Sequence, residues 1–275
     1  MTLSIISVYN DKKSLKENLL PSLKKQTLRF ELILIDNRNN RRFNSAASAL
    51  NWAAKKAQGK YLLFVHQDII LPDKNWLRKA EKILNKLPKL GIAGIAGINK
   101  KSLATGYIDD GGQPWGRPFK KPQRTQTLDE CLIIIPRKVF KKLQFDEKNF
   151  DHWHCYAVDY SLAVTYRGFK AYAIPLFAKH MCRRMNLTDL LIHQEKVLKK
   201  HYPKYKYICT TCGFLTPSTI AFRKRIGSNI ITDIYVSFVR NYWLAIIENP
   251  NDFMAIKLLK RAAKVIFKKL KLHYD

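Results

Sequence analysis

The sequence has few glycines and prolines and no paired set of cysteines, and each shortage excludes a class of protein. Glycine and proline number 11 each in 275 residues, while 47% of the residues are hydrophobic. This composition excludes a collagen-like or disordered chain and indicates a globular one. The five cysteines are odd in number and lack the spacing of a disulfide framework, which predicts a reducing compartment. A single CxxC, Cys209 to Cys212, has no second pair nearby and does not indicate zinc.

Long uncharged hydrophobic runs are also missing. The most apolar late stretch, residues 230–247, contains Asp233 and Arg240, which a membrane span tolerates poorly. Residues 1–10 enter a strand pattern directly, so we expect no signal peptide. These absences predict a cytoplasmic protein.

Acidic residues are scarce relative to basic ones. There are 21 of them against 50 lysines and arginines, which gives a formal net charge of +29. Such an excess indicates an anionic partner, namely nucleic acid, acidic lipid or a phosphorylated substrate. No recognisable nucleic-acid-binding module is present, so no nucleic-acid partner is expected, and a basic nucleic-acid-binding protein remains only an alternative.

What the first third does contain is an alternation of short apolar runs with helical patterns, and each run leads to an acid. The runs and acids are Leu3–Val8 with Asp11, Phe30–Ile35 with Asp36, and Lys60–Val65 with Asp68. This alternation predicts an α/β fold with a mostly parallel sheet flanked by helices. Carboxyl ends of parallel strands meet at one edge, where ligands bind, so the three acids are expected to converge. Asp11 and Asp36 can equally cap the helices that follow them.

Further elements are predicted along the rest of the chain. Helical spacing indicates helices over 12–26, 45–57, 74–87 and 158–166, and apolar runs indicate strands over 91–98, 128–136 and 170–174. Residues 99–127 are rich in glycine and proline and carry a basic run at 117–124, so they are predicted to be a long loop. That loop is either a mobile flap over a phosphate-bearing ligand or a solvated insertion.

The motifs, taken in order, resemble those of family 2 glycosyltransferases with the Rossmann-like GT-A fold. They are Ser7–Asp11, Glu31–Asn37, Ala54–Asp68, Leu128–Pro136, Phe145–Glu147, Tyr156–Leu162 and Gly168–His180. The chain is most similar to the branch whose metal motif reads His-Gln-Asp, with Asp-Glu-Cys before a later strand. The resemblance covers roughly residues 1–211. It implies metal-dependent transfer of a sugar from a nucleotide-diphosphate donor to an acceptor hydroxyl. The QxxRW motif of processive synthases is missing, which favours single additions.

The resemblance implies Mn²⁺ or Mg²⁺ as the cofactor, since hard phosphate oxygens favour these ions. It places Asp68 as the final acid of the metal motif and His180 as a second ligand. His66 stands where many relatives have an acid, so it binds the metal, contacts the sugar or orients Asp68. An inactive relative that binds sugar nucleotides without transfer is therefore a further alternative.

Asp159 matches the position of the family's catalytic base, and direct attack with such a base inverts the anomeric configuration. Its other interpretation is a helix N-cap. The remaining predicted site residues divide between the two substrates. Those for the nucleotide and donor are Tyr9, Asp11, Asp36, Asn37, Gln67, Asp68 and Arg183, and those for the acceptor or sugar are Asp129, Glu130, Trp153, His154 and Tyr156.

Residues 216–275 lie beyond the resemblance, so we expect a GT-A domain at 1–215 and a helical basic region at 216–275. Residues Lys257–Lys271 hold seven basic residues and no acid. On a helical wheel six of the basic residues fall within an arc of about 100°. This pattern predicts an amphipathic helix at an anionic membrane surface, on its cytoplasmic face, as a lipid-linked acceptor in cell-surface glycan or glycolipid assembly would need. A helix docked on the protein core is the alternative.

Overall fold

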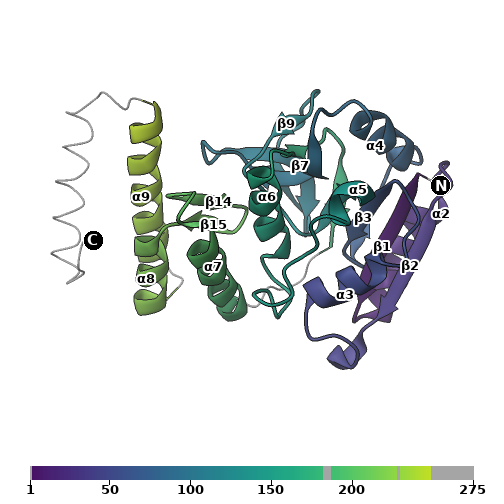
Figure 1. Ribbon diagram of the computed structural model, residues 1–275, viewed down its shortest axis with the longest axis horizontal. Coiled ribbons are helices and arrows are strands. Elements are labelled where there is room, and N and C mark those ends of the chain that lie inside the picture. The colour runs from purple at the N-terminus through teal and green to yellow at the C-terminus, as the bar shows by residue number, and fades with distance from the viewer. Residues whose placement is uncertain (1, 182–186, 228–229, 249–275) are drawn as a thin grey trace.

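A seven-stranded sheet forms the centre of the protein (Figure 1), and its strand order is β2-β1-β3-β11-β5-β12-β9. The computed structural model describes residues 2–181, 187–227 and 230–248. The strands are β1 Leu3–Tyr9, β2 Glu31–Asp36, β3 Tyr61–Val65, β5 Leu90–Gly94, β9 Gln123–Arg124, β11 Leu132–Pro136 and β12 Lys170–Ala173. Five of them share one direction, and β11 and β9 run against the rest. The predicted α/β fold with a mostly parallel sheet is confirmed.

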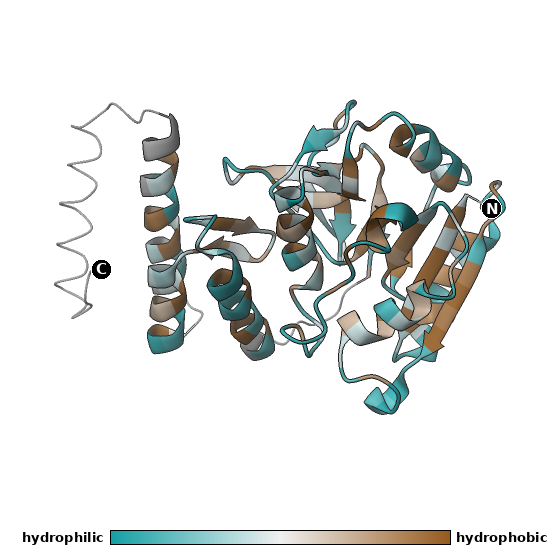
Figure 2. Cartoon of the chain, in the orientation of Figure 1, coloured by the Kyte–Doolittle hydropathy of each residue, from teal (hydrophilic) through white to brown (hydrophobic). Residues whose placement is uncertain are grey.

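Helices cover both faces of this sheet, because alternate residues of each strand point to opposite sides. On β3, Leu63 packs in a core with Leu19 and Trp76, while Phe64 packs in a second core with Leu50 and Tyr160. Figure 2 shows hydrophobic residues concentrated along the strands between these helices. The helices are α1 Lys12–Glu17, α2 Leu19–Lys24, α3 Ala46–Ala54, α4 Trp76–Leu84, α5 Arg137–Phe140 and α6 Tyr156–Tyr166, with a short 3-10 turn at Arg38–Asn40.

A second sheet lies beside the carboxyl ends of the central strands and contains much of the segment predicted as a loop. Its strands, in the order β10-β6-β7-β13-β4, are β10 Thr127–Leu128, β6 Ala96–Ile98, β7 Ala104–Asp110, β13 Ala178–His180 and β4 Ile69–Ile70, and β8 Gln113–Gly116 pairs with β7. The prediction of a long loop over 99–127 is therefore wrong. A hairpin forms because Gly111 and Gly112, with φ of 63° and 90°, supply the tight turn. The pairing of β7 with distant β13 cannot be read from local composition.

Three elements predicted as continuous are broken. The helix expected over 12–26 is α1 and α2, divided at Asn18, because Pro21 lacks the N–H that a continuous helix would need there. The strand expected over 91–98 is β5 and β6. The strand expected over 128–136 is β10 and β11, with residues 129–131 between them. This last break turns Asp129 and Glu130 out of the sheet ladder and toward the cavity described below.

The C-terminal elements form one end of the molecule (Figure 1), and several of them share a hydrophobic cluster with α6. They are α7 Leu187–His201, β14 Ile208–Thr210, β15 Gly213–Leu215, α8 Pro217–Ile226 and α9 Ile230–Glu248. Val197 of α7 and Ile220 of α8 share a hydrophobic cluster with Leu162 of α6. In the part of the chain that the structure describes, no helix has the length and apolar character needed to cross a membrane. The basic stretch Lys257–Lys271 lies outside the described residues.

Candidate active site

A cavity of about 610 Å³ opens at the carboxyl ends of β1 and β3, within the size range of sites for small ligands. One wall comes from Tyr9 at the end of β1 and Asn10 after it, together with the 3-10 turn after β2. The base comes from His66, Gln67 and Asp68 after β3. The far walls come from the break between β10 and β11, the start of α6, β13, α7 and the β14–β15 turn. Residues distant in sequence thus meet where an open α/β sheet binds its ligands.

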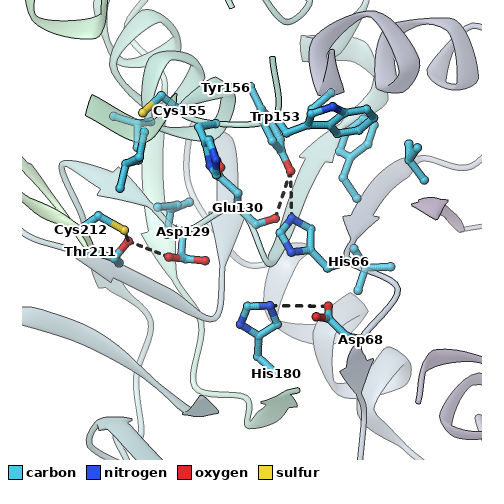
Figure 3. A pocket seen from close by; sticks show the side chains of 18 of the residues that line it. His66, Asp68, Asp129, Glu130, Trp153, Cys155, Tyr156, His180, Thr211 and Cys212 are labelled. Carbon is cyan, nitrogen blue, oxygen red and sulfur yellow. Dashed lines mark hydrogen bonds and ion pairs between the residues drawn. The ribbon is translucent and has the colours of Figure 1, made fainter. Parts of the chain in front are cut away.

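Two imidazoles and one carboxylate meet at the base of this cavity (Figure 3). His66 and Asp68 occupy the turn after β3, and His180 ends β13. One potential ligand atom from each of the three lies within 4.8 Å of the others. The Nε2 atom of His180 is 3.6 Å from Oδ1 of Asp68, and the two imidazole rings have centroids 5.6 Å apart. Burial, reinforced by His180, lowers the pKa of His66 and favours its neutral, ligating form.

This donor set fits a divalent cation. Imidazole nitrogen and carboxylate oxygen are both ligands for first-row divalent ions, and three protein ligands leave coordination positions open for substrate oxygens. The structure therefore brings together the three residues that the sequence predicted for a metal site. Among the described residues it is the only cluster of at least three His, Cys, Asp or Glu side chains with this geometry.

Asp110 orients one of these imidazoles, and the sequence analysis did not single it out. Its Oδ1 lies 2.9 Å from Nδ1 of His180. A carboxylate at Nδ1 holds the proton there and leaves the lone pair of Nε2 directed toward Asp68. The only signal in the sequence that could have indicated Asp110 was its place in residues 99–127, which were interpreted as a possible flap over the ligand. Trp115 of β8 also lines the cavity from that segment and was missed.

Gln67 ties the metal motif to the turn after β1. Its Oε1 accepts hydrogen bonds of 3.0 Å from the backbone N–H groups of Asn10 and Asp11. Its Nε2 donates a bond of 2.7 Å to Oδ1 of Asn10. Gln67 thus lines the cavity and also fixes one wall against its base.

Two of the three acids at the strand ends do not line the cavity. Asp11 caps α1, accepting hydrogen bonds from Lys13 and Ser14. Asp36 is held bidentately by Arg38, with bonds of 2.9 and 2.6 Å, and these hydrogen bonds lower the pKa of Asp36. Of the three, only Asp68 reaches the cavity, although Tyr9 and Asn37 beside the other two do line it.

Asn37 has a structural task as well. It is 1% exposed, and its side-chain amide forms hydrogen bonds with the backbone of residues 42 and 43. It therefore holds the loop after β2 in place against the cavity. Arg183, predicted to contact the diphosphate, lies outside the described residues.

Asp129 and Glu130 lie in the break between β10 and β11 (Figure 3). Their pKa values are shifted in opposite directions. Burial opposes ionisation of Asp129, but hydrogen bonds from the Thr211 hydroxyl at 2.6 Å and the Cys131 N–H outweigh it and lower the pKa of Asp129. Burial and the neighbouring charge of Asp129 raise the pKa of Glu130 well above its ordinary value. Adjacent carboxylates with pKa values moved apart are typical of acid–base sites.

The predicted acceptor aromatics are all at the cavity. Trp153, His154 and Tyr156 line it at the start of α6, and the Tyr156 hydroxyl lies 3.4 Å from Nε2 of His66. Other lining residues at this end were not predicted, and they are Asp189, Leu190, Gln194, Thr210 and Thr211. The cysteines at 131, 155, 209 and 212 are free thiols.

Asp159, predicted as the catalytic base, is placed elsewhere. Its side chain is 3% exposed and does not line the cavity. Its Oδ1 lies 2.7 Å from Nε2 of His201 and 2.8 Å from Nζ of Lys200, both on α7. It is not a side-chain N-cap either, since Cys155 occupies that position of α6. In the structure Asp159 joins α6 to α7.

Two curated proteins are similar to this chain in sequence. Among curated proteins, the chain is 26% identical over 196 residues to the protein of ATP synthase subunits region ORF 6 of Fuscovulum blasticum, covering 66% of this chain and 76% of that protein. It is 27% identical over 187 residues to the O-antigen biosynthesis protein RfbC of Myxococcus xanthus, covering 53% of this chain but only 14% of that much longer protein.

Solved structures share the fold at low identity. GalNAc-T7, solved with UDP, GalNAc and Mn²⁺, matches with a TM-score of 0.56 and 15% identity over 75% of this chain and 49% of its own. The mannosyltransferase PcManGT from Pyrobaculum calidifontis, solved with GDP-Man and Mn²⁺, matches with a TM-score of 0.53 and 14% identity over 96% of this chain and 80% of its own. TarS 1–349 from S. aureus, solved with UDP-GlcNAc, matches with a TM-score of 0.50 and 17% identity over 74% of this chain and 67% of its own. At these identities the likeness establishes the fold.

The sequence pattern of the glycosyltransferase-like family matches residues 4–205, most of the chain. Of the strands that line the cavity in the described part of the chain, only β14 lies outside that match. The protein belongs to the glycosyltransferase-like family and is a glycosyltransferase.

Proposed function

We propose that this protein transfers a sugar from a nucleotide-diphosphate donor to an acceptor hydroxyl with the help of a divalent cation. The observation that carries the proposal is the His66, Asp68 and His180 cluster at the base of the cavity. The ion, Mn²⁺ or Mg²⁺, would neutralise charge that develops on the leaving diphosphate. The mannosyltransferase and GalNAc-T7 structures that share the fold contain Mn²⁺.

The donor lies at the β1–β3 end of the cavity in this proposal. Tyr9 and Asn10 form the cavity wall there, and Gln67 lies in the base next to Asp68. The amide and hydroxyl groups of these three residues suit a ribose and a nucleobase. The role of Asp36 and Asp11 is indirect, since their carboxylates hold Arg38 and cap α1. The acceptor lies at the other end, against Trp153 and His154.

Transfer is proposed to be direct, and therefore inverting, with one sugar added at each encounter. The cavity carries carboxylates beside the cluster that can accept a proton from the attacking hydroxyl. The match to an O-antigen biosynthesis protein supports a role in cell-surface glycan assembly. A lipid-linked acceptor would explain the basic stretch 257–271 as a contact with an anionic membrane at its cytoplasmic face.

The test is a thermal-shift panel of UDP-, GDP- and dTDP-sugars, each with and without Mn²⁺. We expect at least one donor to raise the melting temperature, and to do so more strongly with Mn²⁺, because binding to the native state stabilises it. Asp68→Asn should abolish the Mn²⁺-dependent part of the shift. No shift with any donor would overturn the proposal, and a shift without release of nucleoside diphosphate would favour an inactive sugar-nucleotide-binding relative.

A further inference from the structure

We propose that Glu130 is the general base that takes the proton from the attacking hydroxyl. This inference rests on the proposed function and adds the identity of the base. It comes from the placement of every carboxylate in and around the cavity, and it assigns the role to a residue other than the one that the sequence pattern indicated.

Five carboxylates line the cavity among the described residues, at positions 68, 110, 129, 130 and 189. Asp68 belongs to the metal-ligand cluster, and Asp110 is bonded to the Nδ1 atom of His180. Asp129 accepts bonds from Thr211 and Cys131, which stabilise its ionised form and weaken it as a base. Asp189 lies in the first turn of α7, and its charge interacts with His154. Glu130 remains.

Asp159 is the residue that the motif indicates, but its geometry does not suit proton transfer to substrate. Its carboxylate is absent from the cavity lining, and both Lys200 and His201 already engage it. A substrate hydroxyl would have to displace these buried partners to reach it. A base must come within hydrogen-bond distance of the proton that it removes.

Glu130, in contrast, is both exposed to the cavity and fixed in position. It follows Asp129 in the turn that leaves the sheet between β10 and β11. Its Oε1 lies 3.4 Å from the N–H of Ala157 in the first turn of α6, and its backbone carbonyl accepts a bond from the Tyr156 hydroxyl. These contacts place the carboxylate at the start of α6, in the lining of the cavity that also holds Trp153 and His154.

The environment of Glu130 also strengthens it as a proton acceptor. Burial and the charge of Asp129 raise its pKa, so its carboxylate holds a proton more firmly than an exposed glutamate does. In the proposed step, the hydroxyl oxygen forms a bond to the anomeric carbon. The bond from that carbon to the diphosphate oxygen breaks, and its electron pair leaves with the nucleoside diphosphate. The hydroxyl proton passes to Glu130.

The experiment measures donor hydrolysis, in which water replaces the acceptor, as release of nucleoside diphosphate from the donor that gives the largest thermal shift. Glu130→Gln keeps the size and the oxygen that faces Ala157 but removes the base. Asp151→Asn, which changes an exposed carboxylate outside the cavity lining, is the control, and Asp159→Asn and Asp189→Asn test the rival residues. Thermal melting and donor affinity are recorded for each variant, so that loss of folding or binding is separated from loss of chemistry.

We expect Glu130→Gln to lower kcat by at least about 100-fold with donor affinity within about threefold, the loss typical for a general base. Azide attacks without giving up a proton, so it should restore nucleoside diphosphate release in Glu130→Ala and form a glycosyl azide. Activity of Glu130→Gln near that of wild type, or an equal kcat loss with intact folding in Asp159→Asn or Asp189→Asn, would overturn the role while leaving the function intact. A wild-type protein that turns over none of the donors would overturn both the role of Glu130 and the proposed function.

Discussion

Asp110 and His180 face each other across the parallel pair of strands β7 and β13, with Oδ1 of the aspartate 2.9 Å from Nδ1 of the histidine. His180 is paired in register with Asp110, so the contact is set by the strand pairing itself. The segment that carries Asp110 was expected to be a loop. It is instead a structural support for the candidate metal site, which makes the site dependent on the β7–β8 hairpin.

Asp110→Ala should weaken Mn²⁺ binding about 10- to 100-fold, the usual effect of removing a partner that orients a ligating histidine. The reason is that Nδ1 of His180 loses its acceptor, so neither the ring orientation nor the tautomer is fixed. Binding is measured by electron paramagnetic resonance of free Mn²⁺, without substrate. Asp109→Asn, which removes the same charge one residue away, is the control and should bind Mn²⁺ as wild type does. Equal affinities in Asp110→Ala and wild type would contradict the orienting role.

Gln67→Met should loosen the turn after β1. Methionine matches the length of glutamine but makes none of the three hydrogen bonds to Asn10 and Asp11. Hydrogen exchange at the amides of residues 10 and 11 should accelerate, and donor affinity should fall about tenfold, which corresponds to about 1.4 kcal/mol. The amide of Asn37, bonded to the carbonyl of Tyr9, should stay protected and serves as the internal control. Unchanged exchange at residues 10 and 11 would show that Gln67 does not hold the turn.

Asp159→Asn should destabilise the fold. Its buried carboxylate pairs with Lys200 and His201, and breaking a buried pair leaves uncompensated charge at a cost of about 3 kcal/mol in the free energy of unfolding. Asp151→Asn is a close control, because Asp151 also pairs with a lysine and a histidine but is 55% exposed. Its cost should be under about 1 kcal/mol. Denaturant unfolding compares the two, and equal costs would refute a structural role for Asp159.

The contribution of Asp146 to stability should depend on pH. Burial opposes its ionisation, but hydrogen bonds from Lys200 and Asn149 lower its pKa from 3.8 to about 2. Since the folded pKa lies below the unfolded value, the contribution is present above about pH 4 and is lost as the pH falls toward 2. The difference in unfolding free energy between wild type and Asp146→Asn should therefore shrink over this range. A difference that stays constant with pH would contradict the lowered pKa.

Neutralising the basic stretch should release the protein from acidic membranes. Replacing Lys257, Lys260, Lys264 and Lys268 with Gln in the full chain removes about 1 kcal/mol of attraction for each residue near the surface. Flotation with phosphatidylserine vesicles is the measurement, and vesicles of neutral lipid are the control. Vesicle binding that is unchanged by the four substitutions would contradict a membrane role for this stretch.

The sequence by itself determined the fold class, because strand and helix periodicities in the first third are local and strong. The buried run Tyr61–Val65 became β3, and the polar residues that follow it became the base of the cavity. Motif order also located His66, Asp68 and His180, which the fold brings together. In these cases the candidate metal ligands are the side chains at or just after the end of a strand, and their identity can be read directly from the sequence.

Tertiary structure alone decided which predicted acids face the cavity. Asp11, Asp36 and Asp159 have the right residue type and the right local position, but partners in the folded chain engage all three. Asp110 and Glu130 reach the cavity through strand pairing and a break in the strand expected over 128–136. Asp11 and Asp36 are held by neighbours two or three residues away, as the capping alternative allowed. The carboxylates of Asp110, Glu130 and Asp159 are instead fixed by contacts with residues about 30 to 70 positions away, and those contacts have no signature in the local sequence.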